Sequence, residues 1–329
     1  MRPAALFPTG TRSIKIARNQ KVHFRAMASD VTLELIDSGP GAAAALEAAQ
    51  QVFHDVEAAC TRFDPTSPLM QANRQPNSWH RLPPMCFAAI REAYDAYITT
   101  CGVFDPRVLS TLLALGYDRS LPFESTDVVV HVATPDFTAR RPTNWTPSFD
   151  HESVAVQIGP EPIDLGGIGK GLAVRWATAL LRDHAAGCLV SAGGDCMTYG
   201  AGPTDSSWLV GVEDPHGGSE PKAVLAIRNL ACATSSIRVR RWHADGRQVH
   251  HLIDPASQSP GGRGLSSVTV VGPDPARAEV WSKVLFLAGA EQIARASELH
   301  ELAALWIAQD GRTWNSAAMD KLITWRPAA

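Results

Sequence analysis

Residues 163–181 read IDLGGIGKGLAVRWATALL, an apolar run with one acidic residue, a glycine-rich turn and then an uninterrupted helical pattern. Asp164 and Lys170 lie on either side of the turn. Residues without a Cβ let backbone amides approach a ligand, and the free N–H groups of a helix N-terminus attract phosphate. A lysine in the first turn opposes the helix dipole unless an anion lies between it and the amides. The segment predicts a phosphate-binding turn; the alternative is a tight strand-to-helix connection with a solvated Lys170.

The glycine turn matches neither of two common phosphate-binding motifs. It is not GxGxxG, and no Ser or Thr follows the Gly-Lys pair as a Walker P-loop requires. The turn by itself therefore leaves both readings open, and the rest of the chain has to decide between them.

Composition describes an ordinary globular protein. The chain has 329 residues, of which 45% are hydrophobic and 19% charged, so it can bury a sizeable core as one large or two ordinary domains. Its net charge is −3, and the basic run at Arg238, Arg240 and Arg241 alternates as at a strand edge. We therefore expect no nucleic-acid partner. The six cysteines show no CxxC spacing, which favours free buried thiols in a reducing compartment.

Targeting signals are absent from the sequence as given. The N-terminus lacks the apolar stretch of a secretory signal, and no run approaches the ~18 apolar residues of a membrane span. We expect a cytoplasmic protein without a membrane span. Residues 1–21 are predicted to be a loose arm, residues 22–329 one domain, and the Pro-, Thr- and Asn-rich stretch at 134–152 a loop or insertion.

Hydrophobic periodicity and turn signals indicate an α+β fold with largely antiparallel sheets and packed helices. Two Asp-Gly pairs, at 245–246 and 310–311, are typical of tight hairpins, and residues 63–73 are turn-rich. Helices are predicted at 42–60, 84–100, 106–115 (closed by Gly116), 172–184 and 275–287. Strands are predicted within 22–36 and at 153–158, 188–192, 208–213, 223–228, 237–242, 247–253, 266–271 and 302–308.

Six motifs together resemble one family. IDLGGIGKG resembles the DLGGIAKG signature of the FAD:protein FMN transferases, the ApbE family. Further matches, in the family's order, are HFRAMASDVTLEL, TRFDPTSPLMQAN, GVFDPRV, SAGGDCMTYG, and ATSSIRV followed by HHLIDPASQSP. The combination spans roughly residues 22–290 and is far more specific than any one member. The resemblance implies the ApbE or T-fold-like architecture.

The resemblance also implies an activity. Family members bind FAD, attach its FMN half by a phosphoester bond to a threonine of a target flavoprotein, and release AMP, with magnesium assisting. This flavinylation is an in-line phosphoryl transfer in which cations neutralise the pyrophosphate and a base accepts the threonine proton. FAD is then the substrate, and a flavoprotein threonine the acceptor.

The resemblance implies a role for individual residues of this chain, motif by motif. His251 matches the histidine suggested as base, Lys170 lies near the phosphates, and the Gly167 carbonyl matches a main-chain metal ligand. His250 and His251 alternate on a strand, so only one of them faces the site. Each position also has a structural alternative, such as a core aromatic residue or a cap before proline. The positions implied to contact FAD are Met27, Phe63, Val103, Phe104, Asp105, Asp164, Lys170 and Leu252.

The metal-binding helix departs from the family pattern. The chain reads AEVWSKVLFLAG at 278–289, where the family reads close to ADALSTALFVLG. Glu279 replaces the aspartate that ligates magnesium, and Lys283 replaces the ligating threonine; a protonated ammonium cannot ligate a metal. Glu279 and Lys283 can pair directly at this spacing. The main reading remains the transferase, with two alternatives: an FAD-binding homologue without catalysis, and an FAD pyrophosphate hydrolase giving FMN and AMP.

Overall fold

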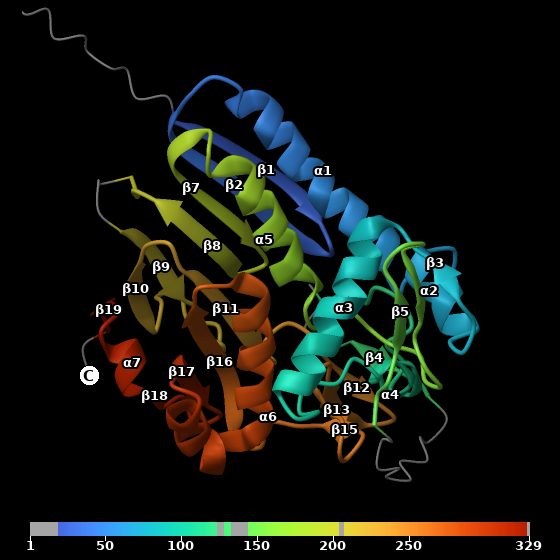
Figure 1. Cartoon of the computed structure of the whole chain (residues 1–329). Coiled ribbons are helices and arrows are strands. Elements are labelled where there is room, and N and C mark those ends of the chain that lie inside the picture. The colour runs from blue at the N-terminus through green and yellow to red at the C-terminus, as the bar shows by residue number, and fades with distance from the viewer. Residues whose placement is uncertain (1–18, 124–127, 133–143, 204–206, 328–329) are drawn as a thin grey trace, which may run out of the picture.

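The computed structural model describes residues 19–123, 128–132, 144–203 and 207–327 (Figure 1). Most of the arm predicted at 1–21 and the first part of the insertion predicted at 134–152 lie outside these residues. Residues 20 and 21 already belong to the first strand, and 148–150 form a short strand. None of the helices in the described ranges is long and apolar enough to cross a bilayer.

An eight-stranded sheet forms the centre of the fold, in the order β1-β2-β7-β8-β11-β16-β17-β18. Every neighbouring pair in it is antiparallel, which confirms the predicted α+β class. Its strands are β1 (Gln20–Ala26), β2 (Ser29–Ser38), β7 (Ala185–Ala192), β8 (Asp195–Gly200), β11 (Ala231–Ser236), β16 (Leu265–Gly272), β17 (Ala303–Ala308) and β18 (Thr313–Asn315).

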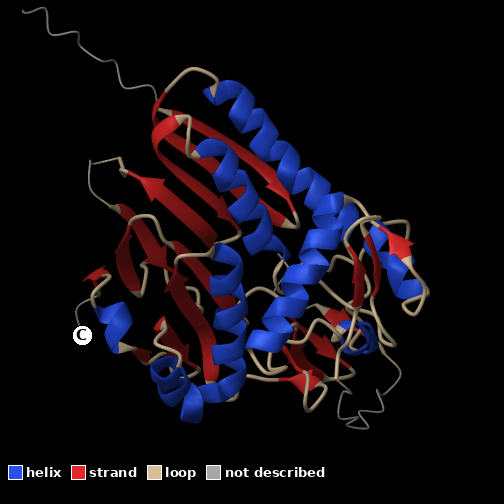
Figure 2. Ribbon diagram, in the orientation of Figure 1, coloured by secondary structure: helices blue, strands red, loops and turns tan. Residues whose placement is uncertain are grey.

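Helices cover one face of this sheet (Figures 1 and 2). They are α1 (Ala42–Cys60), α5 (Gly169–Leu181) and α6 (Pro275–Leu299), with α3 (Pro84–Thr99) packed against α1. Helix α1 is rich in alanine, the strongest helix former, and buries Ala49, Phe53 and Val56 at helical spacing. Between α5 and the sheet, Leu172 and Val190 are fully buried in the main core. This packing fixes the N-terminus of α5 over the sheet.

Small sheets and short helices complete the fold. Among the small sheets, β4 and β12 pair in parallel, whereas the other pairs are antiparallel. These strands are β3 (His80–Arg81), β4 (Val129–Val130), β5 (Ser148–Asp150), β6 (Ala155–Gln157), β9 (Trp208–Val212), β10 (Ala223–Ile227), β12 (Arg241–Ala244), β13 (Arg247–His250), β14 (Ile253–Asp254), β15 (Ser259–Pro260) and β19 (Ile323–Trp325). The short helices are α2 (Pro68–Arg74), α4 (Leu109–Ala114) and α7 (Ala317–Asp320).

The first strand pattern is a hairpin rather than a single strand. Strands β1 and β2 pair in register with Ala26 opposite Ser29, so Met27 and Ala28 form a two-residue turn. Both turn residues have positive φ, 54° and 52°, the backbone of a type I′ turn. The sequence lacks the Asn-Gly or Asp-Gly pair that normally marks this turn, which is why periodicity alone did not separate the strands. The backbone N–H of Met27 donates to Glu57 of α1 at 2.9 Å, which ties the turn to the helix layer.

Three helix predictions need correction, and a further helix, α2, was not predicted. The helix predicted at 172–184 is α5, which runs over Gly169–Leu181 and so includes Lys170 in its first turn. Residues 68–74 form α2 inside the stretch predicted as turns, with Ser67 accepting from the N–H of Met70 and Pro68 at the first position. The helix predicted at 106–115 begins only at Leu109. Helix α6 continues beyond residue 287 to Leu299, across a break at Gly289 where φ is 73°.

Gly171 allows the first turn of α5 to pack directly on the start of α6. A Cβ at this position would lie 2.6 Å from Ala276 Cα and 2.7 Å from the Pro275 carbonyl oxygen, so backbone would have to move. We expect Gly171→Ala to lower the free energy of unfolding by about 1–3 kcal/mol. Alanine is the better helix former by about 1 kcal/mol, so the net fall in the free energy of unfolding would understate the steric cost by about that amount.

Thermal and urea unfolding measure this effect. Gly272→Ala is the matched control, because an added Cβ there meets nothing within 4 Å. Equal stability of wild type and Gly171→Ala would contradict the close packing of α5 on α6.

Candidate functional site

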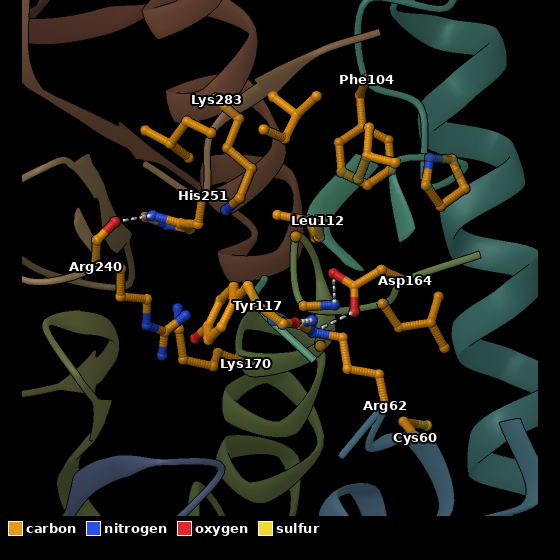
Figure 3. A pocket seen from close by; sticks show the side chains of 18 of the residues that line it. Cys60, Arg62, Phe104, Leu112, Tyr117, Asp164, Lys170, Arg240, His251 and Lys283 are labelled. Atoms are coloured by element: carbon orange, nitrogen blue, oxygen red, sulfur yellow. Dashed lines mark hydrogen bonds and ion pairs between the residues drawn. The ribbon is translucent and has the colours of Figure 1, made fainter. Parts of the chain in front are cut away.

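A pocket opens at the N-terminus of α5 (Figure 3). The β1–β2 turn, the loops near residues 60–63 and 103–108, the segment 251–255 and one face of α6 also line it. Glu279 does not line the pocket; it is 1% exposed and lies behind the lysines that do. The sequence-predicted residues in the lining are Met27, Phe63, Val103, Phe104, Asp105, Asp164, Gly167, Lys170, His251, Leu252 and Lys283.

The glycine turn before α5 brings the backbone close to its neighbours. The Asp164 carboxylate accepts from the N–H of Gly166 at 3.2 Å and pairs with the Arg62 guanidinium at 3.4 Å. A Cβ on Gly167 would lie 3.0 Å from the Phe104 ring, and one on Gly169 would lie 3.4 Å from the terminal methyl of Met27. The turn therefore needs glycine because side chains from two other elements cover it.

Two lysines and two carboxylates form an ion cluster beneath the pocket. The Lys170 ammonium bonds to Asp195 and lies 3.1 Å from Glu279 Oε1. The Lys283 ammonium lies 3.2 Å from the same Oε1, and Glu279 Oε2 accepts from the N–H of Gly171 at 2.8 Å. The solvated Lys170 considered as an alternative is wrong, because this side chain is only 15% exposed and doubly paired.

The cluster is held in its ionised form. Burial by itself would raise the pKa of Glu279, but the charges of Lys170 and Lys283 and the Gly171 N–H lower it to about 2. Burial also disfavours the ammonium of Lys170, yet the charges of Asp195 and Glu279 outweigh it and raise the Lys170 pKa. The pKa of Lys283 is lowered by burial and by Lys170, against the opposing pull of Glu279. An anion bound in the pocket would therefore favour the charged form of Lys283.

His251 presents an unprotonated ring nitrogen. Its Nδ1 lies 3.3 Å from the backbone carbonyl oxygen of Arg240. A carbonyl can only accept, so Nδ1 carries the hydrogen and Nε2 keeps its lone pair. Burial, together with the charges of Arg240 and Lys283, holds the pKa of His251 well below its usual value. The ring is thus neutral and able to accept a proton.

His250 points away from the site, as strand alternation predicts. Its ring packs edge-on against Phe286, with centroids 5.9 Å apart, and Nδ1 lies 3.3 Å from the N–H of Leu252. Burial lowers the pKa of His250 to about 4. His250 is therefore part of the packing under α6 and His251 the pocket-facing member of the pair.

Aromatic and apolar side chains also line the pocket, around Arg62. The Arg62 guanidinium carbon lies 4.3 Å from the centroid of Phe63 and 4.0 Å from that of Tyr117. Such cation–π contacts stabilise a guanidinium that is largely withdrawn from water. Phe63 is 36% exposed and Val103 is 40% exposed, so both offer apolar surface at the rim. This surface can receive a planar ring system.

Asp105 reaches the pocket but its carboxylate is already engaged. It accepts from Arg107 Nη2 at 2.7 Å, from Nε at 3.0 Å and from the Arg107 backbone N–H at 2.9 Å. Phe104, beside it, is 6% exposed with its ring against Gly167. The Asp105–Arg107 pair therefore holds the loop that carries Phe104, which is close to the capping role considered for Asp105.

Comparison with known proteins shows which family this chain belongs to. A model of the ApbE family matches residues 27–306. The chain belongs to the ApbE family. The match includes every candidate site residue named above, from the Met27 turn to the Lys283 helix, so the pocket lies within the part of the chain that matches the family.

Relatives and solved structures agree with this membership. The FAD:protein FMN transferase of Treponema pallidum (strain Nichols) is 32% identical over 180 residues, 51% of this chain and 49% of that protein. The Escherichia coli (strain K12) protein of the same name is 28% identical over 159 residues, 47% and 45% of the two chains. The chain spans about half the length of the curated relatives it matches.

Solved ApbE structures share the fold of this chain. The ApbE protein from Thermotoga maritima superposes with a TM-score of 0.81 at 23% identity, covering 93% of this chain and 99% of that one. Flavin transferase ApbE from Vibrio cholerae gives 0.76 at 20% identity, covering 93% and 99%. At these identities the likeness establishes the fold.

The magnesium ion implied for this family does not fit the residues present. Both oxygens of Glu279 are taken, one by two ammonium groups and the other by a backbone N–H. The Lys283 side chain passes 3.5 Å from the position a Cβ on Gly167 would take, beside the proposed carbonyl ligand. Across the described ranges, no group of three or more His, Cys, Asp or Glu side chains could hold a metal ion.

Four residues at the site were missed from the sequence. Asp195 lies in the GGD motif and received no role, although it is the main partner of Lys170. Arg62 directly precedes Phe63, and Arg240 belongs to the basic run interpreted as a strand edge. Tyr117 follows the glycine that ends α4, and no sequence signal marks it.

Buried neutral histidines make stability depend on pH. In the unfolded chain His250 binds a proton below about 6.5, whereas in the folded protein it does so only near 4. The stability that comes from burying neutral His250 is therefore fully present above the unfolded pKa. It is lost as the pH falls from about 6.5 toward 4. We expect the urea midpoint to be lower at pH 4.5 than at pH 7. His250→Gln should reduce the accompanying loss of unfolding free energy by on the order of 2 kcal/mol.

Urea titrations of wild type and His250→Gln at several pH values make this measurement. Glutamine keeps an acceptor for the Leu252 N–H but cannot titrate. Parallel slopes in the two proteins would contradict the burial of a neutral His250.

Proposed function

We propose that this ApbE-family protein is an FAD:protein FMN transferase, which attaches FMN to a threonine of a target flavoprotein. The observation that carries the proposal is that aromatic and cationic side chains line one pocket. Phe63 and Tyr117 supply aromatic surface, and Lys170, Lys283 and Arg240 supply positive charge; Figure 3 labels Tyr117 and the three cationic residues. A dinucleotide with a ring system at one end and linked phosphates in the middle matches this combination. The relatives named FAD:protein FMN transferase support the same substrate.

The residue roles follow from position in the pocket. Met27, Phe63, Val103, Phe104 and Leu252 supply apolar contacts to the rings of FAD. Asp164 is proposed to accept hydrogen bonds from a ribose or base while Arg62 holds it in place. Asp105 contributes by fixing its loop. Lys170 is proposed to contact the pyrophosphate, which requires its ammonium to keep Asp195 and Glu279 as supports.

Transfer is proposed as a single displacement at the phosphorus of the FMN half. The threonine oxygen attacks, a new O–P bond forms, the P–O bond to the AMP half breaks, and AMP leaves with the bridging oxygen. The threonine proton moves to Nε2 of His251, whose ring is neutral and oriented by the Arg240 carbonyl. Lys170, Lys283 and Arg240 stabilise the charge on the phosphoryl oxygens.

Two further parts of the proposal concern the whole chain. We place residues 22–329 in one flavin-transferase domain, since the central sheet runs from β1 to β18 across that range. We place the protein and its acceptor in the cytoplasm, because all six cysteines are free thiols, as expected in a reducing compartment.

A second candidate function is an FAD-binding homologue without transfer activity. The capture of Glu279 by two lysines favours it, because the family's metal chemistry has no place at this carboxylate. The two candidates share the FAD pocket and differ only in whether FMN reaches a protein. A hydrolase that releases FMN and AMP without an acceptor would share the pocket as well.

Incubation with FAD and a flavoprotein that carries the acceptor threonine tests the proposal. We expect covalent flavin fluorescence in the acceptor band on a denaturing gel. His251→Asn should lower the transfer rate by about 10²–10⁴-fold, because it removes the proton acceptor, and leave FAD affinity nearly unchanged. His250→Gln is the matched control and should keep the wild-type rate.

Each alternative gives a different result in the same assay. FAD binding with no labelled acceptor in any condition would support the non-catalytic homologue. FMN and AMP appearing without labelled acceptor would support the hydrolase. Failure to bind FAD at all would exclude the three together.

A further inference from the structure

The carboxylate of Glu279 already has the neighbours that a metal ion would need to displace. Oε1 lies 3.1 Å from the Lys170 ammonium and 3.2 Å from the Lys283 ammonium, and Oε2 accepts from the N–H of Gly171 at 2.8 Å. The side chain is 1% exposed and is absent from the pocket lining, so bulk solvent does not reach it. A divalent cation could reach this carboxylate only by removing two charged hydrogen-bond donors from a buried acceptor.

Lys283 extends from α6 toward the glycine turn. It lies one helical turn after Glu279, and its Cε would be 3.5 Å from a Cβ on Gly167. Its side chain is 17% exposed and lines the pocket that Glu279 does not reach. The ammonium group thus pairs with a buried carboxylate, while the Lys283 side chain lines the pocket, where Figure 3 labels it.

The side chains around this end of the pocket leave an excess of positive charge. Asp195 and Glu279 compensate Lys170 and Lys283, while Arg240 also lines the pocket. Within the described ranges, the Arg240 guanidinium makes no hydrogen bond or ion pair. A dianionic pyrophosphate would find a complete set of donors here without any metal, since ammonium and guanidinium groups bind phosphate directly.

We propose that the Lys283 ammonium takes the place of a divalent cation in this protein, so that it binds the pyrophosphate of FAD without metal. Glu279 then serves to position Lys170 and Lys283 and does not coordinate a metal. This inference rests on the proposed function, because it specifies how the same pocket holds the FAD phosphates. It predicts that removing metal leaves nucleotide affinity intact, whereas removing the Lys283 charge does not.

Flavin fluorescence quenching on the purified full chain tests the inference. The dissociation constant of FAD is measured in EDTA and again with excess Mg²⁺. We expect the two wild-type values to agree within about twofold, and Lys283→Met to weaken FAD binding by about tenfold or more in both conditions. Methionine keeps most of the side-chain length and removes only the charged donor. Lys283→Arg should restore most of the affinity.

Lys21→Met is the control for loss of a lysine elsewhere. Lys21 pairs with Glu34 at 3.0 Å on the β1–β2 hairpin and is absent from the pocket lining, so its removal should leave FAD affinity unchanged. A separate titration of Mn²⁺, followed by its paramagnetic resonance signal, reports metal binding without reference to flavin. We expect no stoichiometric Mn²⁺ site in the wild-type protein, with or without FAD.

Failure of this inference is distinct from failure of the proposed function. Wild-type FAD binding that disappears in EDTA and returns with Mg²⁺, or a stoichiometric Mn²⁺ site, would overturn the inference and leave the transferase standing. Absence of FAD binding in both conditions would overturn both. The wild-type comparison needs no variant, so the result does not depend on Lys283→Met folding normally.

Discussion

The buried ion cluster formed by Lys170, Asp195, Glu279 and Lys283 is the constraint on which the site depends. It joins three elements, since Lys170 is on α5, Asp195 on β8, and the other two on α6. Charges withdrawn from water are tolerated only when each has a partner with good geometry, and loss of one leaves another uncompensated. The cluster therefore fixes the helices and the sheet relative to each other at the point where the pocket opens.

The cluster also gives the pocket a positively charged surface. The two carboxylates are directed into the protein, where Asp195 accepts from the N–H of Thr234 at 3.0 Å and Glu279 from that of Gly171. The ammonium groups of Lys170 and Lys283 lie between these acids and the pocket, so the surface that a ligand meets is cationic. Because the acids hold the lysines in place before any ligand arrives, the proposed binding of phosphate would require little rearrangement of these side chains.

Local sequence patterns predict an element correctly where the conformational preferences of neighbouring residues determine it. The Asp245-Gly246 pair predicts its hairpin because only a few residue types adopt positive φ, and β12 and β13 do pair across it. The Met27 turn has the same geometry with residues that rarely adopt it, so no local signal separated β1 from β2. Helix α2 carried a cap and an initial proline, but its apolar face is too short to show periodicity.

The sequence by itself determined the α+β class and the family resemblance, and the resemblance placed Lys283 where the family motif has a metal ligand. These inferences depend only on residue identity, order and spacing. Only the tertiary structure showed that Glu279 also binds Lys170, that Asp195 supports Lys170, and that the Arg62 guanidinium packs on the ring of Tyr117. These contacts join residues far apart in the chain. Their existence depends on how helices and sheet pack, which no local pattern encodes.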